Sequence, residues 1–124
     1  MNCSCVYIDW DGDVIDINPT VKIRKARKNH ICTECNREIL TGEKYEYVSG
    51  KWGGDFMTFR TCLICREIRT TFFCQSWSYG DILNDLREHL WEIKGEISDS
   101  CLSEMSKPAR NKVCDMIENI WKEI

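Results

Sequence analysis

The chain has 124 residues, of which 43% are hydrophobic, and a formal net charge of −3. This length suits one domain that buries about two-thirds of its unfolded surface, so we expect a single domain over residues 1–124, with parts at 1–21, 22–76 and 77–124. No stretch approaches the roughly 20 apolar residues that cross a bilayer, and the start lacks an export signal. We therefore expect a cytoplasmic protein without a membrane span.

The charges are unevenly distributed along the chain. Residues 1–21 contain four acidic and no basic residues, residues 22–70 contain eleven basic and six acidic residues, and the last 54 residues contain six basic and ten acidic residues. A basic centre thus lies between acidic flanks. The chain as a whole is not an obvious binder of polyanions.

The first part of the chain has strand character. Residues 3–17 alternate in polarity around Asp11-Gly12, which predicts a β-hairpin with a tight turn there, and Asn18-Pro19 is expected to end it. The following run, residues 22–28, alternates poorly and is densely charged. We predict an extended lead-in that lies across the next module, with its basic side chains in solvent or against an acidic partner.

Two Cys-x-x-Cys pairs are the most informative motif: Cys32 with Cys35, and Cys62 with Cys65. Without an export signal a reducing compartment is expected, where such pairs serve as metal ligands rather than as disulfides. Four thiolates at this spacing predict one tetrahedral Zn²⁺ site, which we favour over a redox dithiol or an iron–sulfur cluster. Such a site is closed and structural.

The segment between the pairs predicts how the ligands are brought together. Strands are expected at 45–48 and 56–61 with a turn at 49–55, followed by a helix that Thr61 caps and whose Ile68 and Phe72 share a face with Ile64. Asn36 suits a left-handed position after the first pair. A knuckle, a hairpin and a helix in this order predict an α+β fold containing a treble-clef or zinc-ribbon-like module.

Two further helices are predicted toward the C-terminus. Asp81 can cap the first, and Ser106 with Pro108 opens the second. Each has an apolar stripe at helical spacing, which we expect to be buried in the core. The stripes consist of Ile82, Leu86, Leu90 and Ile93, and of Val113, Met116, Ile117, Ile120, Trp121 and Ile124.

A second metal site is a weaker hypothesis. Cys3, Cys5 and Cys74 remain outside the two pairs, and His30 or His89 could complete a set of four ligands. In the alternative interpretation Cys74 is a small buried hydrophobic residue, Cys3 and Cys5 are strand residues, and His30 is a hydrogen-bonding residue. Cys101 and Cys114 are expected to be core or surface thiols on helices.

Several of these segments resemble the uncharacterised small zinc-ribbon-like proteins of phages and prophages, over roughly residues 22–90. The resemblance implies a zinc fold and a phage-related origin, and it defines no activity. The segments that carry it are Arg27–Cys35, Ile39, Gly42–Tyr45, Phe59–Cys65, Phe72–Cys74 and Leu86–Leu90, together with the Cys-Ser-Cys opening.

Catalysis is not expected. Asp9 to Asp13 resembles the Asp-x-Asp motif of haloacid-dehalogenase phosphatases, but the chain lacks their alternating β/α framework. Treble clefs also underlie HNH nucleases, whose chemistry needs a His general base beside a hydrolytic metal. Neither His30 nor His89 occurs in that setting, so we predict a protein without enzymatic activity.

Two binding hypotheses remain. In the first, the chain binds a host or phage protein in the host cytoplasm and inhibits a defence or regulatory complex. Its contact residues would be Lys22, Arg24, Lys25, Arg27, Lys28, Trp52 and Phe56. In the second, the basic segment 22–28 binds nucleic acid together with Arg60, Arg66 and Arg69. The oligomeric state is left open.

Overall fold

The computed structural model describes residues 5–6, 15–74 and 76–123, with the side chains of the first strand described from Pro19 onward. The chain forms two compact units, Asp9–Arg66 and Met1–Ile8 with Glu67–Ile124. A sheet dominates the first and helices the second, so the predicted α+β class is confirmed. The turn predicted at Asp11-Gly12 lies outside the described residues. Within them, no helix has the length and apolar character needed to cross a bilayer.

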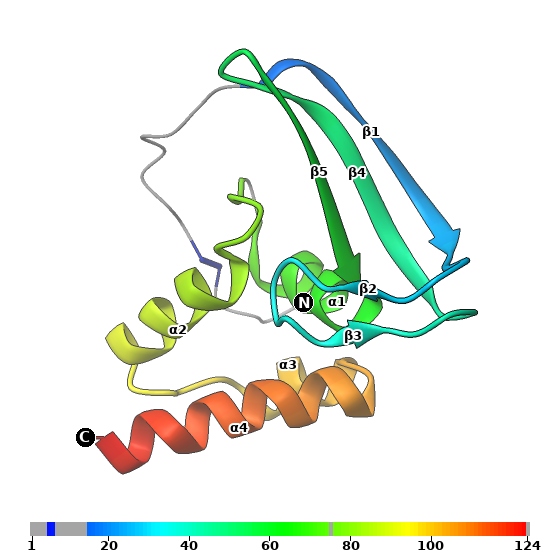
Figure 1. Cartoon of the computed structure of the whole chain (residues 1–124). Coiled ribbons are helices and arrows are strands. Elements are labelled where there is room, and N and C mark those ends of the chain that lie inside the picture. The colour runs from blue at the N-terminus through cyan, green and yellow to red at the C-terminus, as the bar shows by residue number, and fades with distance from the viewer. Residues whose placement is uncertain (1–4, 7–14, 75, 124) are drawn as a thin grey trace. The chain divides into compact units, whose positions relative to one another are not determined.

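The Asp9–Arg66 unit contains two small antiparallel sheets (Figure 1). Strands β1 (Ile15–Lys25), β4 (Lys44–Trp52) and β5 (Asp55–Cys62) form the larger sheet, in the order β1-β4-β5. Strands β2 (His30–Ile31) and β3 (Glu38–Ile39) form the smaller one. The predicted hairpin is thus confirmed as β4 and β5, but its turn is shorter than the predicted 49–55, because residues 49–52 belong to β4 and Asp55 begins β5. Both residues of its tight turn have positive φ, 57° at Gly53 and 90° at Gly54, which glycine adopts without a steric penalty.

Strand β1 corrects the prediction for the first part of the chain. Asn18-Pro19 does not end a hairpin, because Ile15–Lys25 pairs with β4 along its whole length. Proline fits here for two reasons: β1 is an edge strand of the sheet, and the register shifts between Ile17 and Thr20. The predicted lead-in at 22–28 therefore belongs to the sheet as far as Lys25.

Four helices follow, α1 (Leu63–Phe72), α2 (Ile82–Glu92), α3 (Asp99–Glu104) and α4 (Lys107–Glu123). Three were predicted, whereas α3, which Ser98 caps by accepting a hydrogen bond from the N–H of Cys101, was not. Thr61 does not cap α1, because it lies within β5 and its Oγ1 has no hydrogen-bond partner among the described residues.

The Glu67–Ile124 segment builds its core from the predicted stripes. Their buried members are Ile68, Phe72, Ile82, Leu86, Leu90, Val113, Ile117 and Ile120. Trp121 differs from the prediction, since 57% of it is exposed. Its indole Nε1 donates a hydrogen bond to the carbonyl of Lys94, at 2.9 Å, which ties α4 to the end of α2. Ser106 likewise donates from its N–H and its hydroxyl to the carboxylate of Glu67, both at 2.6 Å.

Replacing Gly95 by alanine is expected to destabilise this unit by about 1–3 kcal/mol. Gly95 has φ +72°, and an added Cβ would lie 2.8 Å from Nε1 of Trp121 and 3.0 Å from Cγ2 of Ile117. Thermal unfolding of Gly95→Ala measures the cost, and Gly80→Ala is the matched control. Gly80 has φ +92° with nothing within 4 Å of an added Cβ, so it isolates the backbone penalty from the clash. Equal destabilisation by both variants would contradict the expected clash.

Candidate metal centre and basic face

Four sulfur atoms of the Asp9–Arg66 unit converge on one point. The Sγ atoms of Cys32, Cys35, Cys62 and Cys65 all lie within 4.8 Å of one another, and those of Cys35 and Cys62 are 3.9 Å apart. Cys32, Cys62 and Cys65 are fully buried and Cys35 is half-buried. The predicted ligand set is therefore brought together, and it can hold one metal ion.

Local structure places each pair. Cys32 follows β2, and the N–H of Cys32 donates to the carbonyl of Arg37 while that of Asn36 donates to the carbonyl of Cys32, closing a tight knuckle before β3. Asn36 has φ +62°, which confirms its predicted left-handed conformation. Cys62 ends β5 and Cys65 lies in the first turn of α1, so a strand-to-helix junction supplies the second pair.

Hydrogen bonds between the thiols shift their pKa values in opposite directions. The pKa of Cys32 is far below its usual value, because its sulfur is hydrogen-bonded to the thiols of Cys62 and Cys65. The same hydrogen bonding to Cys32 raises the pKa of Cys62 to about 11, and it also raises the pKa of Cys65. These hydrogen bonds thus favour the thiolate form at Cys32 over that at Cys62 and Cys65. A metal ion that recruits all four sulfurs has to displace the remaining protons.

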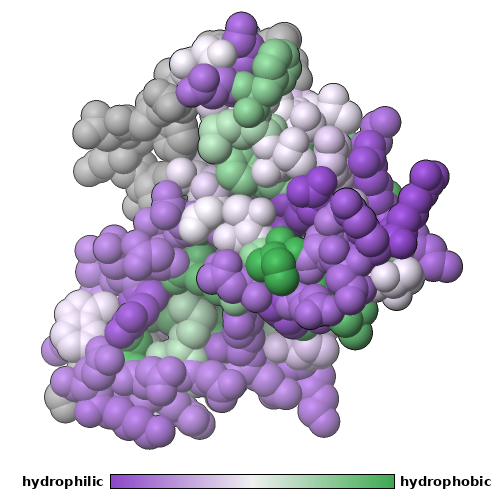
Figure 2. All heavy atoms as spheres, viewed as in Figure 1, coloured by the Kyte–Doolittle hydropathy of each residue, from purple (hydrophilic) through white to green (hydrophobic). Residues whose placement is uncertain are grey.

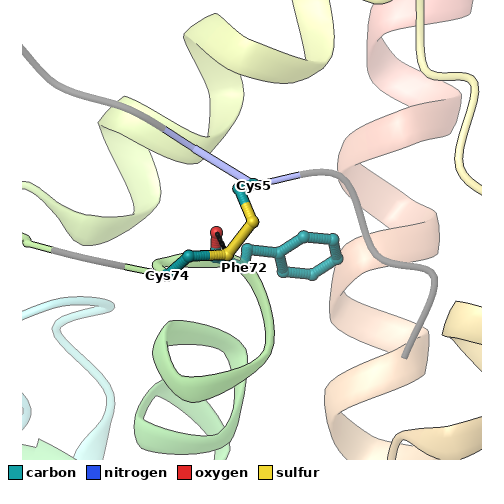
Figure 3. The surroundings of a disulfide bond; sticks show 3 residues. All are labelled: Cys5, Phe72 and Cys74. Atoms are coloured by element: carbon teal, nitrogen blue, oxygen red, sulfur yellow. Dashed lines mark hydrogen bonds between the residues drawn. A yellow bond between two sulfur atoms is a disulfide. The ribbon is translucent and has the colours of Figure 1, made fainter.

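The second predicted metal site is wrong. Cys5 and Cys74 form a disulfide that links positions 69 residues apart, and a disulfide sulfur is not a thiolate ligand (Figure 3). The N–H of Val6 donates to the carbonyl of Phe72 at 2.8 Å, so a backbone hydrogen bond lies beside the covalent link. Cys3 lies outside the described residues. The bond also departs from the expected reduced state, since disulfides are rare in reducing compartments.

The two other helical cysteines and the two histidines lie outside the four-cysteine cluster. Cys101 is buried and disulfide-bonded, rather than the expected thiol, whereas Cys114 is a half-buried free thiol. The ring centroids of His30 and Tyr45 are 5.4 Å apart. Desolvation lowers the pKa of His89, which lies on α2.

One face of the larger sheet is basic and aromatic. Directly opposed residues of antiparallel strands project from the same face, so the pairings Lys22–Tyr47, Tyr47–Arg60 and Lys51–Phe56 put these side chains together. Arg24 joins them, with its guanidinium 3.8 Å from the Tyr47 ring centroid. We call this surface the basic face; it consists of Lys22, Arg24, Tyr47, Lys51, Phe56 and Arg60, with Thr20, Ser49 and Thr58 between them.

The opposite face of the same sheet is different. Val48 and Glu46 are buried there, and Glu46 receives a hydrogen bond from Nε of Arg66 at 3.0 Å. The basic face carries no carboxylate at its described positions, which leaves its positive charges without internal neutralisation. The pKa of Tyr47 is lowered, first by hydrogen bonds with Ser49 and Thr58 and further by the charges of Arg24 and Arg60.

A hollow of about 790 Å³ adjoins the basic face at the end of β1. Desolvation lowers the pKa of His30 in its wall, and the charges of Arg60 and Lys28 lower it further, as expected where cations crowd together. Figure 2 shows hydrophilic atoms gathered over the end of β1 and the β2–β3 segment. The hollow is lined by Arg24, Lys25, Arg27, Lys28, His30, Tyr45 and Arg60.

The four-cysteine cluster and the hollow share a structural link. Thr33, inside the Cys32–Cys35 knuckle, donates from its N–H to the carbonyl of Arg60 at 2.7 Å. In return, its Oγ1 accepts a hydrogen bond from the N–H of Arg60 at 3.0 Å. The position of Arg60 therefore depends on the shape of the knuckle.

The predicted contact residues are divided by the structure. Lys22, Arg24, Lys25, Arg27 and Lys28 are exposed on the basic face or the hollow. Phe56 is 78% exposed, as predicted, and Figure 2 shows hydrophobic atoms over the β4–β5 turn.

Three other predicted contacts do not fit. Trp52 packs edge-on against Phe59, with ring centroids 5.4 Å apart, and covers Gly50, so it is not a free anchor. Arg66 pairs with Glu46, and Arg69 is buried in the helical unit with its guanidinium 4.8 Å from the Trp77 ring centroid.

Sequence reasoning did not include Tyr47 and Lys51 in the basic face. The signal was present, because Val21-Lys22-Ile23-Arg24 alternates apolar and basic residues with the period of two that a strand requires. Reading that run as a strand would have put Lys22 and Arg24 on one side of it. The partner strand and its register could not be obtained in this way.

Comparisons with known proteins add no relatives: no protein-family model matches the chain, and no curated protein or solved structure is significantly similar to it. The resemblance to small phage proteins therefore stays a prediction.

Proposed function

We propose that the four cysteines hold one Zn²⁺ in a structural, treble-clef-like site. Zinc–thiolate bonds of about 2.3 Å in a tetrahedron separate the sulfurs by about 3.8 Å, close to the 3.9 Å between Cys35 and Cys62. All four ligands come from the protein, which leaves no open coordination position for a substrate. This supports a role in folding and binding rather than in catalysis.

We further propose that the zinc-stabilised unit is a nucleic-acid-binding module that uses the basic face. The observation that carries this proposal is the composition of that face: four cations, two aromatic rings and no carboxylate on one side of a three-stranded sheet. The net charge of −3 does not oppose it, because the acidic residues are concentrated in other parts of the chain. Local positive charge is what attracts a phosphate backbone.

Single strands suit this face better than duplexes. Sheet surfaces that bind single-stranded nucleic acid combine cations along the backbone path with aromatic side chains on which bases stack. The Arg24 guanidinium lies over the Tyr47 ring, and Phe56 provides an exposed ring with the Lys51 ammonium 5.9 Å from its centroid. The described residues of the basic face lie on strands, so this face presents no helix that could enter a major groove.

The double variant Lys22→Gln/Lys51→Gln is expected to weaken binding of a single-stranded oligonucleotide by about tenfold at moderate salt. It should also reduce the slope of log affinity against log salt by about 1.4, since each neutralised phosphate contributes about 0.7. Fluorescence anisotropy with a labelled oligonucleotide measures both. Lys107→Gln/Lys112→Gln removes the same charge from α4 and should change neither.

The proposal fails if the wild-type protein, loaded with zinc, binds no single-stranded probe at low salt. It also fails if the α4 variant loses as much affinity as the basic-face variant, because binding would then follow net charge rather than this surface. Zinc content has to be equal in all samples.

A second candidate function is binding of a protein partner through the end of the β4–β5 hairpin. It is favoured by Phe56 and Met57, which are 78% and 43% exposed at that end. Large exposed hydrophobic side chains are typical anchors of protein interfaces. Affinity capture of a host or phage protein by the wild type, but not by Phe56→Ala, would support this candidate. Capture that depends on neither Phe56 nor Met57 would exclude the hairpin end.

A further inference from the structure

We propose that the hollow at the end of β1 is a binding site for the terminal phosphate monoester of a nucleic-acid strand. This deepens the proposed function and rests on it, because the strand is the one that the basic face would bind. Arg24 and Arg60 belong to both surfaces. A strand that runs along the basic face past Tyr47 thus arrives at the hollow.

The charge of the hollow favours a monoester over a diester. Five cationic side chains line it, and none of its described lining residues is acidic. A terminal phosphate carries about −1.5 to −2 at neutral pH and three acceptor oxygens, whereas each internal phosphodiester carries about −1. A concave group of cations therefore attracts the terminal phosphate of a strand more strongly than an internal phosphodiester.

Arg60 is the central cation of the site. Its Nε is buried and has no hydrogen-bond partner within the part of the chain that the structure describes. Its guanidinium is 5.8 Å from the centroid of Tyr47, and its main chain is fixed by the two hydrogen bonds to Thr33. Among the residues that the structure describes, no carboxylate pairs with this side chain, so its charge is available for an anionic ligand.

The size of the hollow favours an organic ligand over a bare ion. A volume of about 790 Å³ lies in the range of sites for small organic ligands, roughly 300–1,000 Å³. It can take the terminal nucleotide together with its phosphate. The rings of Tyr45 and His30 form part of the wall and offer apolar contact beside the cations.

The test uses the zinc-loaded full chain and one single-stranded oligonucleotide sequence in three forms, with a 5′-phosphate, a 3′-phosphate or hydroxyls at both ends. We expect at least one phosphorylated form to bind about tenfold more tightly than the hydroxyl form, as one or two charge-assisted hydrogen bonds would produce. Inorganic phosphate should remove this preference by competition. The two phosphorylated forms show which strand end enters the hollow.

Two matched variants separate the hollow from the basic face. Arg27→Gln/Lys28→Gln removes two exposed cations of the hollow and should abolish the preference for a phosphorylated end. Lys22→Gln/Lys51→Gln removes two cations of the basic face and should weaken all three forms equally, with the preference retained. Each variant should keep the zinc content of the wild type.

The outcomes distinguish the two proposals. Equal binding of all three forms overturns the terminal-phosphate site and leaves the basic face in place. A preference that survives in Arg27→Gln/Lys28→Gln also overturns it. A phosphoserine peptide that competes as well as the phosphorylated oligonucleotide would assign the hollow to a phosphoprotein instead and overturn the proposal. Absence of binding by every oligonucleotide overturns both the site and the proposed function.

Discussion

Removal of zinc from the full chain is expected to unfold the Asp9–Arg66 unit. Binding of zinc to a four-thiolate site contributes on the order of 10 kcal/mol, which is comparable to the whole stability of a small domain. The described core of this unit is small and includes three of the four cysteines. Little apolar burial would remain to hold β4 and β5 once the sulfurs separate.

The variant Cys62→Ser tests the same point without a chelator. Cys62 is buried at the junction of β5 and α1, and its N–H donates to Sγ of Cys32 at 3.4 Å. We expect the variant to lose the bound zinc and the dispersed amide resonances of β4 and β5. Elemental analysis measures the first and heteronuclear NMR the second. Cys114→Ser is the control, since Cys114 is a free thiol on α4.

A metal-free protein that keeps its strand resonances and melting temperature would contradict the structural role of the site. Loss of zinc from Cys114→Ser would contradict the assignment of the ligands. Because Thr33 links the knuckle to Arg60, zinc removal should also abolish oligonucleotide binding.

The four-cysteine cluster could be predicted from the sequence because its signal is local. A Cys-x-x-Cys pair brings two sulfurs together within one turn, and Asn36 next to the first pair is a residue that tolerates positive φ. Because the two pairs converge on one point, the chain between them has to turn back on itself, as a hairpin does. These features depend on neighbouring residues, and the structure reproduces them.

The features that were missed depend on contacts between distant segments. Asn18-Pro19 has turn chemistry, yet pairing with β4 over Ile15–Lys25 outweighs that local preference. The basic face exists only through the register of three strands, one of which was not expected. Trp52 was predicted to contact a partner because it lies in a Gly-rich segment. Its ring instead packs against Phe59 and over Gly50 of the same sheet.

The disulfide between Cys5 and Cys74 could not be predicted from the sequence. With several cysteines left over, many pairings are open and spacing does not select one. The expectation of reduced thiols led instead to the hypothesis of a second metal site. The physical requirement for a disulfide is proximity in the fold, here a Cα–Cα separation of 5.7 Å.

Loss of this disulfide is expected to destabilise the protein by about 4 kcal/mol, because the bond closes a loop with a sequence separation of 69. Its removal restores that conformational freedom to the unfolded chain. The double variant Cys5→Ser/Cys74→Ser is the preferred test, since a single substitution leaves a partner thiol that can form other bonds. Chemical denaturation, with Cys114→Ser as the control, measures the difference.

A double-mutant cycle makes this test specific. If the two cysteines act only through their mutual bond, Cys5→Ser, Cys74→Ser and the double variant should cost about the same free energy. Additive costs would contradict the disulfide. Alkylation of the unreduced native protein gives an independent readout: Cys114 should be modified, whereas Cys5 and Cys74 should stay protected until a reductant is added, although Cys74 is exposed.

Reduction and chelation should therefore act on different cysteines. A reductant opens the Cys5–Cys74 bond and the disulfide of Cys101, and it leaves zinc thiolates intact. A chelator releases Cys32, Cys35, Cys62 and Cys65 for alkylation without opening either disulfide. Tying Cys32 to Cys65 through zinc would roughly halve the free loop that the disulfide closes. Since loop entropy grows with the logarithm of length, this changes the contribution of the disulfide by only about 0.6 kcal/mol. The free energies of unfolding of the zinc-loaded wild type and the zinc-loaded double variant should thus still differ by most of the predicted value of about 4 kcal/mol.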